Sequence, residues 1–507
     1  MAIDSNMARC FSLVFLGLFV SPLSLIVLCL STLKNLIYPS SELCQNRIRH
    51  NTSQRTILVT GVGMAKGLTL ARAFYLCGHR VIGADFEDHL IPCSGRFLKG
   101  LLAFYRLPRP CISTHTKAYI NSLVQIIKDE GVDLWVSCSG VASAIEDAQA
   151  KEVIEYQTLC KCIQFDVATT SLLHEKNKFM RACLERRLSV PETHEVTSGD
   201  QIMRFLSSSA LLHPSRKHIL KPIGVDDVNR GDMTLLPLPS DLMTREHVFR
   251  LPISPSTPWI LQQFIQGGEE YCTHTLVVRG ELKCFVACPS SELLMHYTPL
   301  PQEDVLWHDM REFSIQFLER FPAAESMTGH LSFDFMVMKG NKDGSKKTIY
   351  AIECNPRAHT AVVLFAQQGP EMRDMVRAYL SAIEEPQDSS LDANVVCQQK
   401  SGWEKMLVTP PRVCRSRYWL GNDIVSLLLY PILRLITGSA GFMDVLASSL
   451  IFLGHLCTWK EGSFELWDPL PALVLYNIYW PLTILSAWWQ GRHWSRINVS
   501  TTKMFAC

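Results

Sequence analysis

Residues Gly329–Arg357 read GHLSFDFMVMKGNKDGSKKTIYAIECNPR, and this stretch carries the most specific motif of the chain. Two apolar runs, LSFDFMVM and TIYAIEC, flank a turn region rich in Gly, Lys, Asn and Asp, a pattern that predicts a β-hairpin. Each predicted strand carries one carboxylate within its apolar run, Asp334 in the first and Glu353 in the second. Burying a lone carboxylate costs several kcal/mol unless it is paired or binds a metal. We therefore expect each of these two carboxylates to have a cationic partner or a bound metal ion.

Asn355 lies two residues after Glu353, and side chains two apart in a strand point to the same face of a sheet. Three oxygen-bearing side chains can therefore converge, and Mg²⁺ prefers one or two protein carboxylates together with substrate phosphates. Arg357, at the next position on that face, is a fixed cation suited to a phosphate or a carboxylate. From spacing alone, the alternative is a solvated edge hairpin whose acids face water.

This constellation resembles the ATP-grasp superfamily. There, an acidic residue on one strand and a Glu-x-Asn-x-Arg motif on the next hold the metal and the ATP phosphates, and the sequence ECNPR matches that motif. The resemblance implies that Asp334, Glu353 and Asn355 hold Mg²⁺, with Mn²⁺ as an alternative ion. It also implies that Arg357 is a catalytic residue that offsets the charge of an acyl phosphate.

Two lysines upstream match positions that the family uses to hold ATP. Lys176 stands at a predicted helix start in HEKNKF, ahead of a Val-Pro-x-Thr sequence, with Lys178 as the alternative. Glu175 replaces the Asp that usually precedes this lysine. Lys221 ends the predicted strand His218–Pro222, where the family lysine reaches the ATP phosphates, so the resemblance implies both a binding and a catalytic role for it.

The loop that closes over the phosphates in the family corresponds to Gly224–Gly231. It is less Gly-rich than usual and carries two acids, although backbone N–H groups of such a loop can still bind phosphate. The Pro-rich segment that follows, Asp232–Pro258, is predicted to be an irregular insertion.

The run WILQQFI, Trp259–Ile265, resembles the hinge strand of the family, which binds the adenine edge. The resemblance assigns the adenine site to four consecutive residues, Gln262, Gln263, Phe264 and Ile265. Glutamines replace the usual Glu here, and an amide oxygen can accept the same hydrogen bond. Glu270 is the candidate for the ribose, with Glu269 left open because one extra Gly shifts the spacing.

The N-terminal third contains a strand, Thr56–Thr60, a glycine loop, Gly61–Gly67, an apolar helix, and a second strand that reaches Asp85. This order is typical of a doubly wound α/β unit, in which such a loop can bind a dinucleotide and the acid its ribose. No Tyr-x-x-x-Lys pair, expected of a short-chain dehydrogenase, occurs in the chain. ATP-grasp enzymes usually begin with a similar domain that helps to form the substrate site, and the loop Ser137–Ser143 is the candidate lining.

Both ends of the chain are apolar. The stretch Cys10–Leu33 carries no charge and is long enough to cross a bilayer, which favours an anchor over a cleaved signal peptide. Apolar runs recur at Ile424–Ile436, Gly438–Trp459 and Pro469–Gly491, which indicate membrane spans or an interfacial helix set. Arginines and lysines after the first stretch predict a multi-pass or N-terminally anchored membrane protein whose catalytic part faces the cytosol.

Composition narrows the function classes. The 507 residues carry a net charge of +1, so nothing indicates bulk attraction to nucleic acid. The 18 cysteines form no paired CxxC set, which favours reduced thiols over a disulfide scaffold.

The sequence therefore predicts an ATP-grasp fold of mixed α/β and α+β class, with an N-terminal doubly wound α/β domain and terminal transmembrane helices. The expected parts are an anchor over 1–36, the α/β domain over 55–170, the ATP-grasp domain over 171–385, a linker over 386–411, and a hydrophobic, membrane-associated region over 412–507.

The resemblance implies an ADP-forming carboxylate–amine ligase. The γ-phosphoryl group of ATP would pass to a small-molecule carboxylate, and an amine would attack the acyl phosphate to give an amide or peptide bond. Amino acids are candidate substrates, membrane lipid is the expected partner, and fungal secondary metabolism is one setting for such an anchored enzyme. Two alternatives stay open: a nicotinamide-dependent oxidoreductase built on the Gly61 loop, and a catalytically inactive ATP-grasp membrane scaffold.

Overall fold

A parallel sheet of five strands, in the order β3-β2-β1-β4-β5, forms the N-terminal α/β domain. The computed structural model describes residues 5–37, 54–88, 90–110, 113–140, 143–212, 215–223, 232–290, 295–338, 347–384 and 407–506. The chain turns back between β1 and β4, which is the doubly wound arrangement that the sequence predicts. The elements are β1 (Thr56–Thr60), α3 (Ala65–Leu76), β2 (Arg80–Phe86), β3 (Leu101–Leu107), α4 (Ser113–Glu130), β4 (Leu134–Val136), α5 (Ala144–Gln157) and β5 (Lys161–Ile163).

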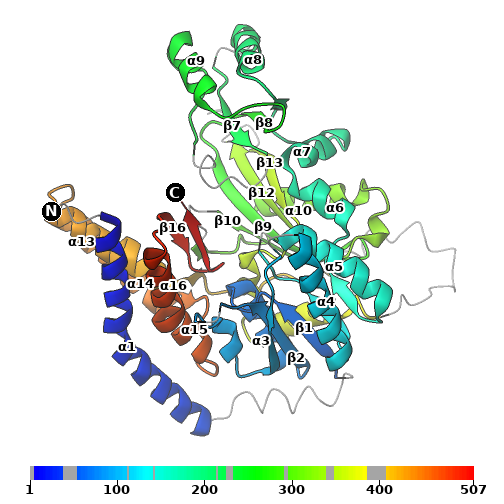
Figure 1. The fold of residues 1–507 in the computed structure, drawn as a ribbon, viewed down its shortest axis with the longest axis vertical. Helices are drawn as coiled ribbons and strands as arrows, with labels where there is room; N and C mark the ends of the chain where they lie inside the picture. Colours follow the sequence, from blue (N-terminus) through cyan, green and yellow to red (C-terminus); the bar gives the residue numbers. More distant parts are fainter. Residues whose placement is uncertain are drawn as a thin grey trace.

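Side-chain alternation along β1 explains how both faces of this sheet are covered. Ile57 and Val59 belong to a buried cluster with α3, whereas Leu58 belongs to a separate cluster with side chains of α4 and α5. Every residue of β1 is buried, as expected for a central strand of a parallel sheet between two helix layers. Figure 1 shows this domain in the lower part of the molecule.

A four-stranded antiparallel sheet, in the order β10-β9-β12-β13, carries the predicted hairpin. Alternate residues of β12 from Leu331 to Val337 are buried against the helices on one face. The ring of Phe333 lies 5.9 Å from Phe179 and 5.4 Å from Phe317, so this face is apolar and the other face carries the polar residues. The elements are α6 (Val167–His174), α7 (Lys176–Glu185), β9 (Glu269–Val278), β10 (Glu281–Pro289), α10 (Val305–Glu319), β12 (Gly329–Met338), β13 (Thr348–Asn355) and α11 (Pro370–Leu380).

A three-stranded antiparallel sheet, in the order β6-β8-β7, forms the lobe at the top of Figure 1. Its elements are β6 (Thr193–Val196), α8 (Gly199–Leu212), β7 (His218–Pro222), α9 (Asp241–Arg250) and β8 (Trp259–Gln263). The prediction that Asp232–Pro258 is irregular is wrong in its middle, because α9 lies there. Ser240 caps α9 by accepting a hydrogen bond from the backbone N–H of Met243, a start signal that the surrounding prolines obscure.

The C-terminal residues add strands and helices to the sheets that precede them in the chain. β14 pairs with β11 on one side and β15 on the other, and Val408 exchanges two backbone hydrogen bonds with the edge of β10. Residues 407–411 of the expected linker are thus attached to the sheet, and its remainder lies outside the described residues. The elements are β11 (His296–Tyr297), β14 (Arg417–Tyr418), α12 (Leu420–Asp423), α13 (Tyr430–Ile436), α14 (Phe442–Thr458), β15 (Lys460–Glu461), α15 (Leu470–Val474), α16 (Trp480–Trp489), β16 (Trp494–Asn498) and β17 (Lys503–Ala506).

The expected transmembrane helices at both ends are not confirmed. Among the described residues, one helix, Leu470–Trp489, is long and apolar enough to cross a membrane, and 44% of its apolar window is buried inside the protein. The N-terminal helix α1 (Ser5–Ile37) packs on it, with Val14 against Ile484 and Ala487. Part of the apolar surface of these helices therefore packs against protein. Hydropathy along the sequence does not distinguish such packing from insertion in lipid.

A buried ion pair ties the C-terminal region to the N-terminal domain. The guanidinium of Arg72, on α3, donates to Asp468 Oδ2 at 2.8 Å and to the carbonyl oxygens of Ser463 and Asp468. Asp468 Oδ1 also accepts from the backbone N–H of Lys99 at 2.9 Å. Both charged side chains are almost fully buried, so each depends on the other for its hydrogen bonds.

We expect Asp468→Ala to lower the free energy of unfolding by about 3–5 kcal/mol, because it leaves the Arg72 guanidinium buried without its counter-charge. The matched control is Asp374→Ala, which removes a 2.7 Å ion pair with Arg377 on the exposed face of α11 and should cost about 1 kcal/mol or less. Urea denaturation of the two variants measures the difference. Equal losses would contradict the structural role assigned to the buried pair.

Candidate active site

The register of β12 and β13 brings the three predicted metal ligands to one face. Asp334 pairs directly with Glu353, and Ser332 pairs with Asn355. Directly opposed residues in an antiparallel pair share a face, as do residues two apart on one strand. The side-chain amide of Asn355 donates to Asp334 Oδ2 at 2.9 Å, so the two are in contact. The hairpin has a bulge just after Asp334, a feature that commonly re-aims side chains beside active sites.

A lysine from another element approaches these acids. Lys176 is the first residue of α7, and its Nζ lies 3.9 Å from Glu353 Oε2. Lys178, the alternative from the sequence, instead makes a 2.7 Å ion pair with Glu175 and a hydrogen bond with Ser171. Of the two lysines, the geometry therefore brings Lys176 to the carboxylate face.

Lys221 enters from the three-stranded sheet and meets the predicted hinge. Its Nζ donates to Gln262 Oε1 at 2.9 Å, and Gln262 Nε2 donates to Thr193 Oγ1 at 3.1 Å. The side-chain amide of Gln262 therefore accepts a hydrogen bond from Lys221. A glutamate at this position would instead form an ion pair with the lysine.

The backbone of the hinge is held by the neighbouring strands. The N–H groups of Gln263 and Phe264 donate to the carbonyl oxygens of Glu192 and Lys217, each at 2.8 Å. Ile265, the last residue of the predicted adenine site, is buried. The part of the hinge that follows β8 is therefore fixed in place by backbone pairing.

The alternation of β9 separates the two ribose candidates. Glu270 pairs with Met336 and Cys272 with Asp334, so Glu270 shares the face of the metal ligands. Glu269 lies on the opposite face, where its carboxylate accepts from Tyr271. Partial desolvation raises the pKa of the Glu270 carboxyl, with Ser290 and the Lys221 ammonium opposing the shift and Glu353 adding to it. Because the charges of Lys221 and Glu353 both act on the Glu270 carboxyl, Glu270 belongs to the same charged cluster as these two residues.

Two basic residues of this region were not identified from the sequence. His174, at the end of α6, has its pKa lowered by burial and by the Arg357 guanidinium, with Glu353 opposing, which favours the neutral imidazole. Lys66, within the glycine loop, is buried and donates to the carbonyl oxygens of Ser139 and Ala358 at 2.9 and 3.0 Å. Burial, followed by the charge of Arg357, lowers the pKa of Lys66 to about 7. Lys66 thus links the N-terminal domain to the residue after the Glu-x-Asn-x-Arg motif.

The glycine loop lacks the open anion site that a dinucleotide needs. The N–H of Gly63 donates to Asp85 Oδ2 at 2.7 Å, and the N–H of Ala65, at the start of α3, donates to the carbonyl of Ser500 at 2.9 Å. A pyrophosphate would have to displace both acceptors. Asp85 is accordingly engaged with the loop, and burial raises the pKa of its carboxyl. This arrangement disfavours the nicotinamide alternative.

The remaining predicted loops are described in part. The phosphate loop Gly224–Gly231 lies outside the described residues. In Ser137–Ser143, Ser137 Oγ donates to Asp147 of α5 at 2.9 Å and Ser139 Oγ lies 3.4 Å from Thr60 Oγ1 of β1, so these two hydroxyls hold the loop to a helix and to the sheet.

No protein-family model matches the chain, and no curated protein sequence matches it. Among solved structures it is similar to an ADP complex of N5-carboxyaminoimidazole ribonucleotide synthetase, with 14% identity and a TM-score of 0.45 over 64% of this chain and 76% of that one. The same enzyme from Thermotoga maritima gives 13% identity, a TM-score of 0.44, and 64% and 76% coverage. The biotin carboxylase domain of Hydrogenobacter thermophilus 2-oxoglutarate carboxylase, solved with MgADP, ADP and bicarbonate, gives 11% identity, a TM-score of 0.47, and 66% and 71% coverage.

These identities and TM-scores are low, so the likenesses assign neither a substrate nor an activity to this chain. Within the chain itself, the parallel sheet is followed by two antiparallel sheets. Lys176 of α7 approaches Glu353 of the four-stranded antiparallel sheet, and Lys221 donates to Gln262 within the three-stranded one. The architecture is mixed α/β, with a five-stranded parallel sheet beside antiparallel sheets.

Lys66 makes stability depend on pH in a defined direction. With a pKa of about 7 when folded and an ordinary value of 10.5, the unfolded chain binds more protons between these values. The free energy of unfolding should therefore rise with pH through this window, by up to about 1.4 kcal/mol per pH unit from this group. Lys66→Met should remove that rise, and its stability relative to the wild type should be greatest near pH 7.

Denaturation of the wild type and Lys66→Met at pH 7, 8 and 9 measures this difference. Lys161→Met, which changes an exposed lysine on β5, is the control and should keep the pH dependence of the wild type. Parallel pH curves for the wild type and Lys66→Met would refute the assignment of a buried neutral lysine.

Proposed function

We propose that the protein is an ATP-dependent ligase that activates a small-molecule carboxylate as an acyl phosphate and joins it to an amine, releasing ADP. The observation that carries the proposal is the direct cross-strand pairing of Asp334 with Glu353, on the face where Asn355 touches Asp334. Two carboxylates and one amide form a hard-oxygen donor set that fits Mg²⁺. Lys176 at 3.9 Å from Glu353 adds the positive charge that a polyphosphate requires.

In this proposal Asp334, Glu353 and Asn355 hold Mg²⁺, which when bound supplies charge neutralisation for the ATP phosphates. The amide of Asn355 would turn its oxygen to the ion, a rotation that exchanges its contact with Asp334. Lys221 would exchange its bond to Gln262 for a phosphate oxygen, and Lys176 would bind a second phosphate. The hinge and Glu270 would bind adenosine.

Arg357 is proposed to face the acyl phosphate. Its backbone N–H donates to the carbonyl of Asn355 at 2.8 Å, which fixes the arginine directly beyond the ligand strand. Phosphoryl transfer depends on positioning and electrostatic stabilisation, so the proposed reaction requires no nucleophilic side chain from the protein. The guanidinium of Arg357 would contribute by stabilising negative charge. The neutral imidazole of His174 lies within the influence of this cation and of Glu353. Amino acids as substrates, and a role in fungal secondary metabolism, stay predictions from the sequence.

The second candidate is a catalytically inactive ATP-grasp scaffold. The observation that favours this candidate is the replacement of the usual hinge Glu by Gln262. The amide of Gln262 accepts a hydrogen bond from Lys221, the lysine that would otherwise bind an ATP phosphate. An inactive scaffold that does not bind nucleotide should show no thermal shift with Mg-ATP, whereas the ligase should.

We expect Glu353→Ala and Asp334→Ala to lower ATP turnover by about 100-fold or more, because removal of one preorganised electrostatic contact commonly costs 10²–10³ in kcat. Turnover is measured as ADP release with panels of small acids and amines, and Mg-ATP binding as a thermal shift. Glu312→Ala, which removes an exposed acid on α10, should leave both unchanged. Undiminished turnover in Glu353→Ala would remove the assigned site.

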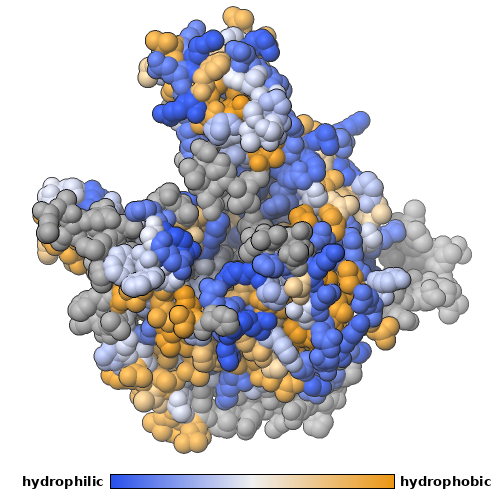
Figure 2. Space-filling view, in the orientation of Figure 1, coloured by the Kyte–Doolittle hydropathy of each residue, from blue (hydrophilic) through white to orange (hydrophobic). Residues whose placement is uncertain are grey.

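We also propose that the apolar C-terminal helices and α1 hold the protein at a lipid bilayer. α13 and α14 have no buried residues, and large apolar side chains of α14 such as Leu450 and Leu453 are 60% and 53% exposed. Figure 2 shows hydrophobic residues gathered at the lower left, over the part of the molecule where Figure 1 draws α1, α15 and α16. An exposed apolar patch of this kind marks an interaction surface, and a bilayer matches its composition. The basic residues after α1 support a cytosolic catalytic part.

Leu450→Glu/Leu453→Glu should reduce co-flotation of the full chain with phospholipid vesicles by about 10-fold or more, because two charges would have to enter the apolar boundary. The matched control is Leu159→Glu, since Leu159 is 96% exposed in the N-terminal domain. Flotation that is equal for the double variant and the control would show that α14 does not contact lipid.

A further inference from the structure

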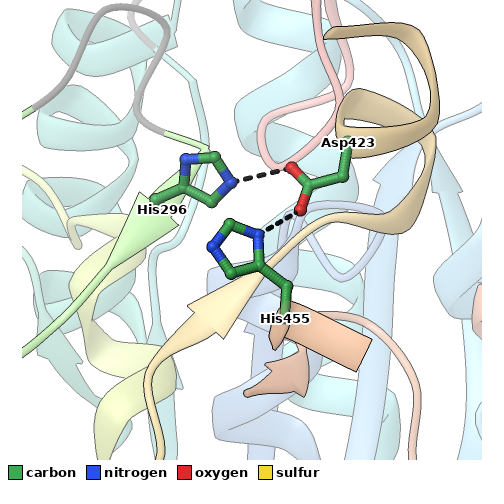
Figure 3. Close-up of side chains that lie close together, drawn as sticks. All are labelled: His296, Asp423 and His455. Carbon is green, nitrogen blue, oxygen red and sulfur yellow. Dashed lines mark hydrogen bonds and ion pairs between the residues drawn. The ribbon is translucent and has the colours of Figure 1, made fainter. Parts of the chain in front are cut away.

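A second group of ligand-type side chains lies apart from the proposed ATP site, where the C-terminal helices meet β11. Asp423, at the end of α12, accepts a hydrogen bond on each carboxylate oxygen. His296 Nε2 lies 2.7 Å from Asp423 Oδ1, and His455 Nδ1 lies 2.7 Å from Asp423 Oδ2. Figure 3 shows one nitrogen of each imidazole directed toward a different oxygen of the carboxylate, with the three side chains coming from three different elements.

The spacing of these atoms suits a single cation. One ligand atom from each residue lies within 4.8 Å of the other two, and within the described part of the chain no other three His, Cys, Asp or Glu side chains meet this condition. Zn²⁺ binds imidazole nitrogen at about 2.0–2.1 Å and carboxylate oxygen at about 2.0–2.2 Å in tetrahedral geometry, which sets ligand atoms roughly 3.3 Å apart. An ion between the three groups therefore requires only small side-chain movements from the observed distances.

The surroundings fix the ligand orientations. Asp423 is fully buried, so its negative charge needs compensation. A bound cation compensates this charge more fully than two neutral imidazole N–H groups do. The His455 ring lies 4.2 Å from the Trp459 ring and 5.0 Å from the His296 ring, which leaves these imidazoles little freedom. Side chains held in this way are preorganised for coordination.

We propose that His296, Asp423 and His455 bind a divalent transition-metal ion of the Zn²⁺ type. Two imidazole nitrogens and one carboxylate are the donors that such ions prefer, whereas Mg²⁺ prefers an all-oxygen set. Each imidazole would coordinate through the nitrogen that now faces Asp423 and carry its proton on the other, Nδ1 of His296 and Nε2 of His455. Water would complete the coordination.

The role of this ion is to fasten the apolar helices to the catalytic part. Its ligands come from β11, α12 and α14, and Asp423 is 127 residues from His296 and 32 from His455. No residue of α14 is fully buried, so burial of apolar side chains contributes little to holding it in place. A metal that binds only the assembled site adds its binding free energy to folding.

The test uses the full-length protein in detergent, stripped with EDTA and then given Zn²⁺ alone. We expect about one bound zinc per chain by elemental analysis, a higher melting temperature, and visible d–d absorption when Co²⁺ replaces zinc. Asp423→Asn and His296→Gln should each weaken zinc binding by at least 10-fold. His194→Gln is the control, because His194 also lies 3.0 Å from a carboxylate, that of Glu192, but forms no three-residue group of ligand type with the other residues that the structure describes.

The outcomes are separable. Zinc binding that is lost in both variants and kept in His194→Gln supports the site. A wild type that binds no zinc, with no shift in melting temperature, would show an ordinary hydrogen-bonded His–Asp–His group and overturn the proposal, as would equal zinc content in all variants. If Asp423→Asn does not fold, His296→Gln, whose side chain is 30% exposed, and the Co²⁺ spectrum of the wild type still decide. Glu353→Ala should keep its zinc, so failure of the ATP site is distinguishable from failure of this one.

Discussion

The register between β12 and β13 is the constraint on which the proposed active site depends. Because strand side chains alternate, a slip of one residue would send Asp334 or Glu353 into the aromatic cluster around Phe333 and remove the acids from their shared face. The aromatic side chains prevent that slip, since each alternate residue of β12 fills space against α7 and α10. The polar face is thus held in place by the apolar one, and the hydrogen bond from Asn355 to Asp334 follows from that packing.

The charges of the site are gathered by contacts between parts of the chain. Lys176 begins a helix, Lys221 ends a strand of a different sheet, and Lys66 comes from the N-terminal glycine loop to bond the carbonyl of Ala358. Burying an ammonium beside the Arg357 guanidinium is unfavourable, which is why the pKa of Lys66 falls to about 7, with burial as the larger cause. The N-terminal domain therefore acts on the site electrostatically as well as sterically.

The C-terminal residues belong to this assembly and also carry its most apolar surface. The buried pair of Arg72 and Asp468, and the backbone contact of Ala65 with Ser500, join them to the N-terminal domain. Leu470–Trp489 and α14 are both apolar helices, yet the apolar window of the first is nearly half buried in protein and no residue of the second is fully buried. The same apolar composition thus covers the protein core in one helix and remains exposed in the other.

The sequence by itself determined the elements and the short motifs, because these depend on local periodicity. Alternation predicted the hairpin of Asp334 and Glu353, and Thr56–Thr60 and Arg80–Phe86 are strands at the expected residues. Spacing did not decide between Lys176 and Lys178, or between Glu270 and Glu269. Tertiary structure separated each pair by placing one member on the carboxylate face and the other elsewhere. It also brought together His296, Asp423 and His455, which no local pattern connects, since ligands far apart in sequence meet only when packing fixes three elements at once.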